Sequence, residues 1–160
     1  IAQNLPKAYA NGDDMEARAN VALANTLAGF YMLCTSQHTM EHAMGGYHDN
    51  LVHGAGLIML SHAYFDFFAS RKAWEPQMIK MAKAMGVADA TSGKDFIKAL
   101  DDLIASVGCA DLRMSDAGIT RDELKKYPKR IHEVLGGDIT ADPLPLSDED
   151  YLTIFEEAYK

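Results

Sequence analysis

Four of the six histidines of this chain lie between positions 38 and 53. His38 and His42 are four residues apart, a spacing that places two side chains on the same face of a helix. The pair Gly45-Gly46 is expected to end that helix, and His53 stands at the start of the next apolar helix. Since neutral imidazole is the commonest metal ligand in proteins, three histidines from two adjoining helices could reach a single ion.

The spacing of these histidines is weak evidence when it is taken alone. Hydrogen bonding of His38 and His42 to neighbouring backbone groups is an equally good interpretation of the pair. His48 in a polar loop and His62 on an apolar helix are expected to have structural roles. Two alternatives therefore stay open: a free-standing helical module that binds a metal or haem, and a structural domain with core histidines.

Two carboxylates in the same segment are less suited to binding a metal. Glu41 precedes His42 and projects about 100° away from it on a helix, which makes a shared ion awkward. Asp49 could reach a metal from its loop, but a loop aspartate more often bonds to its own turn or to water. Neither residue is assigned as a ligand.

The elements that must position the histidines are helical. Apolar residues recur at spacings of three and four along nearly the whole chain, and no segment shows sustained alternation. Residues 120–123 and 147–150 have the spacing of capping boxes. The sequence predicts an all-α fold, a single domain over residues 1–160 built as a bundle of about seven helices. Helical patterns cover residues 1–10, 13–35, 36–44, 53–68, 75–85, 92–107, 120–135 and 147–159.

The composition of the chain limits the classes of partner that it is expected to bind. The formal net charge is −8, and the 15 Lys and Arg residues are scattered, which argues against binding to nucleic acid. The longest apolar stretch, residues 56–69, contains His62 and Asp66 and is too short to span a bilayer. A cytoplasmic protein without a membrane segment is expected. The chain starts at Ile1 rather than at Met, as a truncated or processed protein would.

The segment from His38 to Gly54 resembles the iron-containing (group III) alcohol dehydrogenases. These enzymes carry two histidines four residues apart, a turn of small residues, and a His-Gly pair that opens an apolar helix. Further similarity to the C-terminal half of this family lies at residues 4–8, 15–18, 22–29 and 141–159. The resemblance covers essentially the whole chain. It implies the helical C-terminal domain that the family shares with dehydroquinate synthase-like proteins.

The resemblance also implies site residues. Members of the family hold a divalent metal, iron or zinc, with one aspartate and three histidines, and the last two ligands correspond to His38 and His53. The position of His42 lies near the nicotinamide and the substrate, and is assigned to cofactor binding and to proton handling or substrate positioning. The other two ligands and the N-terminal nucleotide-binding domain lie upstream of the position matched by Ile1 and are absent from this chain.

The implied reaction is hydride transfer between a primary alcohol or aldehyde and NAD or NADP, with the metal acting as a Lewis acid. A chain that lacks two ligands and the nucleotide-binding domain is expected to be inactive alone, and a homo-oligomer is expected. Two features depart from the family pattern. Val52 stands where many members have proline, and the loop between His42 and His53 is one residue longer than in many of them.

Overall fold

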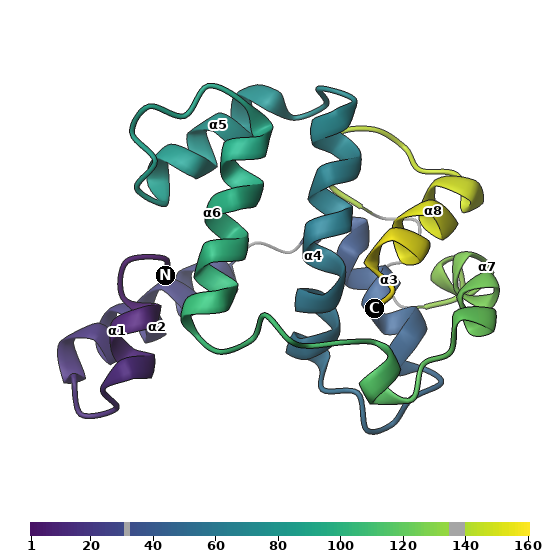
Figure 1. Ribbon diagram of the computed structural model, residues 1–160, viewed down its shortest axis with the longest axis horizontal. Helices are drawn as coiled ribbons and strands as arrows, with labels where there is room; N and C mark the ends of the chain where they lie inside the picture. Colours follow the sequence, from purple (N-terminus) through teal and green to yellow (C-terminus); the bar gives the residue numbers. More distant parts are fainter. Residues whose placement is uncertain (31–32, 135–139) are drawn as a thin grey trace. The chain divides into compact units, whose positions relative to one another are not determined.

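The computed structural model describes residues 1–30, 33–134 and 140–160 of the chain. In these ranges all regular structure is helical, with eight α-helices, two short 3-10 helices and no strand (Figure 1). The predicted all-α fold is therefore confirmed, with a helix count close to the expected one. None of the helices in the described ranges is long and apolar enough to cross a membrane. The chain comprises two compact units, Ile1–Met32 with Trp74–Ala110, and Leu33–Ala73 with Asp111–Lys160.

The first unit is made of two helix pairs. Asp14 caps the second helix by accepting a hydrogen bond from the backbone N–H of Ala17 at 2.9 Å, which satisfies one of the N–H groups left free at a helix start. Ser92 and Asp95 form a capping box at the start of the last helix of this unit. The helices are α1 (Leu5–Ala10), α2 (Met15–Ala28), α5 (Glu75–Ala84) and α6 (Gly93–Ser106).

Helix α2 is shorter and more exposed than its sequence predicts. Ala17 is buried and Val21 half-buried, but Ala28 is exposed and the helix ends there. The N–H of Gly29 bonds to the carbonyl oxygens of Asn25 and Thr26 at the last turn. Residues 33–35 are not helical, so the described residues do not show the expected continuation to residue 35. The expected burial of Tyr31 falls outside the described residues.

The second unit contains the histidine cluster and a larger core. Helix α4 packs against both α3 and α8, and α7 also contacts α3 and α8. The expected central position of the apolar helix is thus found within this unit. Its elements are α3 (Ser36–Gly45), α4 (His53–Ser70), η1 (Ser115–Ala117), η2 (Arg121–Lys126), α7 (Tyr127–Ile131) and α8 (Asp148–Ala158). The largest fully buried side chains include Tyr64, Tyr127, Phe68, Phe155, Met40, Met44 and Leu60.

The helix expected over residues 120–135 is divided in the structure. A 3-10 helix, η2, covers Arg121–Lys126, and the α-helix α7 covers only Tyr127–Ile131. Pro128 stands in the first turn of α7, where its missing N–H is tolerated, whereas a continuous helix would need that donor. The predicted capping box at Thr120 is confirmed, and Leu135 lies outside the described residues.

Candidate metal centre

Helices α3 and α4 are tied together beside the histidines. The side-chain amide of Gln37 donates to the carbonyl oxygen of Leu57 at 2.8 Å and to Oγ of Ser61 at 2.9 Å. Because Gln37 is the neighbour of His38, these bonds fix the turn of α3 that carries the first imidazole against α4. Helix α4 begins at His53, as the sequence predicts.

The structure brings His38, His42 and His53 together. The ring centroids of His38 and His42 are 4.3 Å apart, and the His53 ring lies 5.0 Å from His38 and 5.4 Å from His42. One nitrogen of each ring lies within 4.8 Å of those of the other two. Across the described part of the chain, this is the one group of three or more metal-binding side chains with such geometry. The predicted convergence from two adjoining helices is therefore found, while the role of each histidine stays a prediction.

The surroundings of His38 favour the form of imidazole that binds metals. Burial lowers the pKa of His38 below its ordinary value, and the positive charges that His42 and His53 would carry lower that pKa further. A lowered pKa keeps the ring neutral at neutral pH, and only the neutral ring offers a lone pair to an ion. The donor set therefore fits a divalent metal such as iron or zinc.

Two of the three imidazoles line an open cleft of about 540 Å³ in the second unit. Arg130 and Glu133 also line this cleft. The guanidinium of Arg130 is 3.0 Å from the carboxylate of Glu133. A small molecule that entered the cleft would reach the imidazoles directly, which is the arrangement that a reaction at a metal requires.

Glu41 is the site residue that sequence reasoning missed. Its carboxylate contacts Nδ1 of His53, and its side chain is only 3% exposed, against 49% for His53. The prediction that Glu41 turns away from His42 considered α3 alone, and α4 covers that flank. Glu41 lies between Met40 and Met44, which the structure buries, and a buried carboxylate needs a partner; the sequence alone carried no signal for this burial.

The other candidates of this segment lie elsewhere. Nε2 of His48 lies 3.4 Å from the hydroxyl of Tyr127 and 3.5 Å from Glu123, consistent with its expected structural role. His62 is exposed on α4 although that helix is central, and Asp49 is exposed in its loop. None of these joins the group of three histidines.

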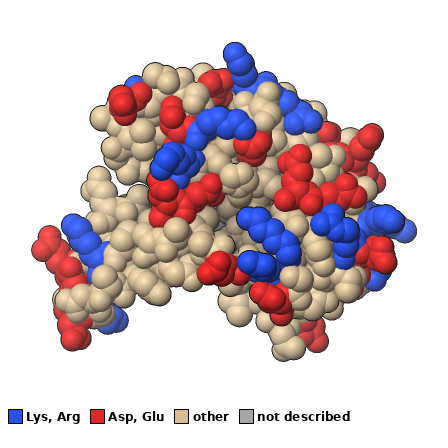
Figure 2. All heavy atoms as spheres, in the orientation of Figure 1, with Lys and Arg blue, Asp and Glu red and all other residues tan. Residues whose placement is uncertain are grey.

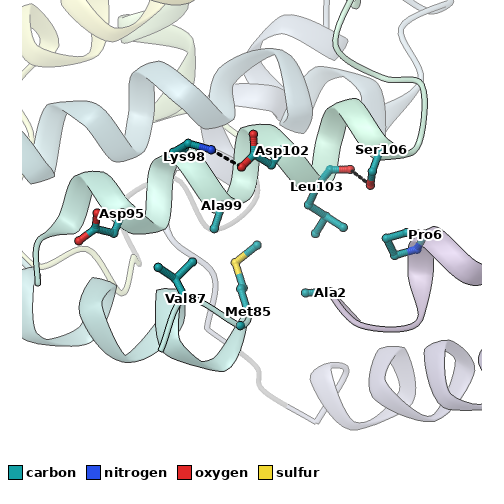
Figure 3. A pocket seen from close by; sticks show the side chains of 11 residues that line it. Ala2, Pro6, Met85, Val87, Asp95, Lys98, Ala99, Asp102, Leu103 and Ser106 are labelled. Atoms are coloured by element: carbon teal, nitrogen blue, oxygen red, sulfur yellow. Dashed lines mark hydrogen bonds and ion pairs between the residues drawn. The ribbon is translucent and has the colours of Figure 1, made fainter. Parts of the chain in front are cut away.

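A second cavity, of about 470 Å³, lies in the first unit beside α6 (Figure 3). Its charged side chains already have partners among themselves or in the helix cap. Nζ of Lys98 is 2.5 Å from Asp102, and Asp95 accepts from the N–H of Ser92. Because these charged groups already have partners, this cavity offers less chemistry than the histidine cleft. On the face of the molecule drawn in Figure 2, basic side chains are likewise interspersed with acidic ones.

Comparison with known proteins agrees with the fold. NADH-dependent butanol dehydrogenase A of Clostridium acetobutylicum is 27% identical over 157 residues, which are 92% of this chain and 40% of that protein. An alcohol dehydrogenase from Oenococcus oeni is 27% identical and superposes with a TM-score of 0.85, over 99% of this chain and 42% of the other. A 1,3-propanediol oxidoreductase gives the same TM-score at 22% identity and shares the fold.

The two relatives at 27% identity are named as a butanol dehydrogenase and an alcohol dehydrogenase, and this chain spans 40% and 42% of their respective lengths. The C-terminal part of the Fe-containing alcohol dehydrogenase family matches residues 1–159. The resemblance seen in the histidine segment thus extends over the whole chain at the level of sequence and of fold. The protein belongs to the Fe-containing alcohol dehydrogenase family and corresponds to its C-terminal domain.

Proposed function

We propose that this chain is the metal-binding and catalytic domain of an alcohol dehydrogenase that transfers hydride between a primary alcohol or aldehyde and NAD or NADP. The observation that carries the proposal is the convergence of three imidazoles beside an open cleft. The relatives support the reaction class, since one of them is named an NADH-dependent butanol dehydrogenase. In this proposal a nucleotide-binding domain and two further metal ligands are supplied by polypeptide outside residues 1–160.

His38 and His53 are the proposed metal ligands. They come from different helices, and their rings are 5.0 Å apart, so that one ion between them would also fix α3 relative to α4 within their unit. A bound divalent ion, iron or zinc, would polarise the oxygen of the alcohol or aldehyde as a Lewis acid. The lowered pKa of His38, caused first by burial, favours the neutral ring that such an ion needs.

His42 is the proposed catalytic neighbour. It lines the cleft and is one helical turn from His38, so a substrate oxygen at the metal would lie within reach of its ring. An imidazole is suited to passing a proton to or from such an oxygen near neutral pH. It can also hydrogen-bond to the nicotinamide or the substrate and orient them, which is the protein's share in a reaction whose redox chemistry belongs to the cofactor.

A second candidate is a three-histidine metal site in a module that acts by itself. The distance between rings favours it, because His42 is closer to His38, at 4.3 Å, than His53 is, at 5.0 Å. In that case all three side chains would be ligands, and metal binding would need no other domain.

Metal binding by single variants separates the two candidates. The chain would be titrated with Co²⁺, whose visible absorption reports its ligands, after replacing His38, His42 or His53 with Ala. The exposed His62 on α4 provides the matched control. Loss of binding in the first and third variants, with binding retained in His42→Ala and in the control, supports the proposal. Equal loss in all three cluster variants supports the three-histidine module instead.

Residues 1–160 alone are proposed to be inactive, because the described residues supply two of the proposed ligands and no dinucleotide site. Butanol oxidation by the chain with NAD and with NADP would be measured directly, and turnover by residues 1–160 alone would overturn this proposal.

Self-association of the chain is also proposed. Leu23 and Leu27 of α2 and Phe30 just after it are exposed, and exposed apolar patches often bind partners. Sedimentation velocity over a range of concentrations tests it.

A further inference from the structure

The buried carboxylate of Glu41 contacts His53, the most exposed histidine of the cluster. Glu41 is enclosed between α3 and α4, and its carboxylate contacts Nδ1 of His53. A carboxylate that is removed from water without a partner is strongly unfavourable. The contact with His53 therefore provides the partner that a buried carboxylate needs at this place.

Gly56 makes room for this carboxylate. A Cβ atom at position 56 would lie 2.7 Å from Cγ of Glu41 and 3.0 Å from its Oε1, which is too close for any side chain. Gly56 is buried within α4, a helix whose interior would otherwise favour a residue with a side chain. Gly56 lies about one helical turn after His53, the residue that Glu41 contacts. Helix α4 therefore leaves space for the Glu41 side chain beside that contact.

We propose that Glu41 is a positioning residue for the metal site, holding the His53 ring by Nδ1 so that Nε2 is the nitrogen directed at the ion. The proposal rests on the proposed function, in which His53 is a ligand. The two nitrogens of an imidazole lie on opposite sides of the ring. A proton held on Nδ1 by a carboxylate leaves the lone pair on Nε2, which faces away from Glu41.

The expected consequence is tighter metal binding. A carboxylate that accepts from a ligand histidine fixes its tautomer and orientation and makes its free nitrogen more basic, and loss of such a partner lowers metal affinity by about 10–100-fold. The effect should be large here because His53 is 49% exposed. An exposed ring would otherwise sample several orientations, and Glu41 is the contact that restricts them.

The tautomer of His53 is the first test and needs no variant. In the metal-free chain at about pH 8, where an ordinary imidazole is neutral, nitrogen chemical shifts distinguish a proton on Nδ1 from a proton on Nε2. The proposal expects the Nδ1–H form of His53 to predominate. A predominant Nε2–H form would overturn it.

The second test measures Co²⁺ affinity in matched variants. Glu41→Ala removes the contact and should weaken binding by about 10–100-fold, whereas Glu41→Gln keeps an oxygen acceptor and should recover part of the loss. Glu133→Ala removes a carboxylate from the same cleft without touching His53, and should leave affinity within about twofold, since a surface charge acts weakly through solvent. Equal losses in the Glu41→Ala and Glu133→Ala variants would show a general charge effect and overturn the proposal.

Gly56→Ala gives an independent variant at the other side of the contact. The added methyl group should displace the Glu41 side chain and weaken Co²⁺ binding without removing any charge. Unchanged affinity in both Gly56→Ala and Glu41→Ala would contradict the positioning role while leaving the proposed ligands in place. If the unmodified chain, which supplies only two of the proposed ligands, binds no Co²⁺, the same variants would be compared in the proposed complete dehydrogenase. Absence of metal there would reject the proposed metal site itself.

Discussion

The hydroxyl of Tyr64 donates a hydrogen bond of 2.5 Å to the carboxylate of Asp142. The same oxygen of Asp142 accepts from the backbone N–H of Ser36 at 2.8 Å. Ser36 begins α3 and Tyr64 is fully buried in the middle of α4. One carboxylate from the segment before α8 therefore connects the two helices that carry the histidines.

Breaking this connection should destabilise the second unit. Tyr64→Phe leaves Asp142 with one donor fewer, and the expected loss is about 1.5–3 kcal/mol because the bond involves a charged acceptor. Asp142→Ala should cost at least as much, since the Tyr64 hydroxyl and the Ser36 N–H then lose their acceptor. Urea unfolding of both single variants and the double variant measures the coupling. Strictly additive losses would show that the bond contributes nothing.

Two buried tyrosines should resist ionisation. Burial raises the pKa of Tyr64, and the charge of Asp142 raises that pKa further. Burial likewise raises the pKa of Tyr127, with added effects of Glu123 and Tyr47. A raised folded pKa gives stability that is present below the ordinary value of about 10 and is lost as the pH rises above it, because the unfolded chain then releases protons that the folded chain keeps.

The measurement is an alkaline titration followed by tyrosinate absorption at about 295 nm, with circular dichroism in parallel. Tyr64 and Tyr127 should ionise only as the chain unfolds, and Tyr64→Phe or Tyr127→Phe should each reduce the amplitude of that late step. Full ionisation of all seven tyrosines before unfolding at about pH 11.5 would contradict the expectation.

The capping box at η2 should stabilise the fold in a pH-dependent way. The backbone N–H of Thr120 holds the pKa of Glu123 below its ordinary value, and the Thr120 hydroxyl and nearby His48 and Lys126 lower that pKa further. A depressed carboxyl pKa gives stability that is present above the ordinary value of about 4.3 and is lost as the pH falls through the folded value.

Glu123→Gln should therefore lower the free energy of unfolding by about 0.5–2 kcal/mol at neutral pH, as loss of a helix cap does. The difference from the unmodified chain should shrink as the pH falls from about 5 to about 3. Asp122→Asn removes the same charge one residue earlier and serves as the control. A pH-independent difference would mean that the charge of Glu123 has no part in the cap.

The proposed role of His42 has a separate signature in the proposed complete dehydrogenase. His42→Ala should retain its metal, whereas turnover should fall by about 10²–10⁴-fold, as loss of a general acid–base group does. Metal content by mass spectrometry and turnover with butanol would be measured on the same preparations. Unchanged turnover at full metal content would exclude His42 from the reaction.

The sequence alone determined the features that depend on local spacing. His38 and His42 fall on one face of α3 because a helix repeats every 3.6 residues, and the glycine pair after them ends that helix as expected. The starts of α4 and α8 and the capping box at Thr120 were predicted correctly for the same reason. Each is set by residues within one or two turns of one another.

Tertiary structure alone decided which groups meet across helices. Nothing in the spacing of Glu41 indicated its contact with His53, because that contact depends on which flank of α3 is covered by α4. The bond from Tyr64 to Asp142 joins residues 78 positions apart, a separation at which periodicity carries no information. Such pairs follow from side-chain volumes and from the need to partner each buried polar group, and both are settled only when the helices pack.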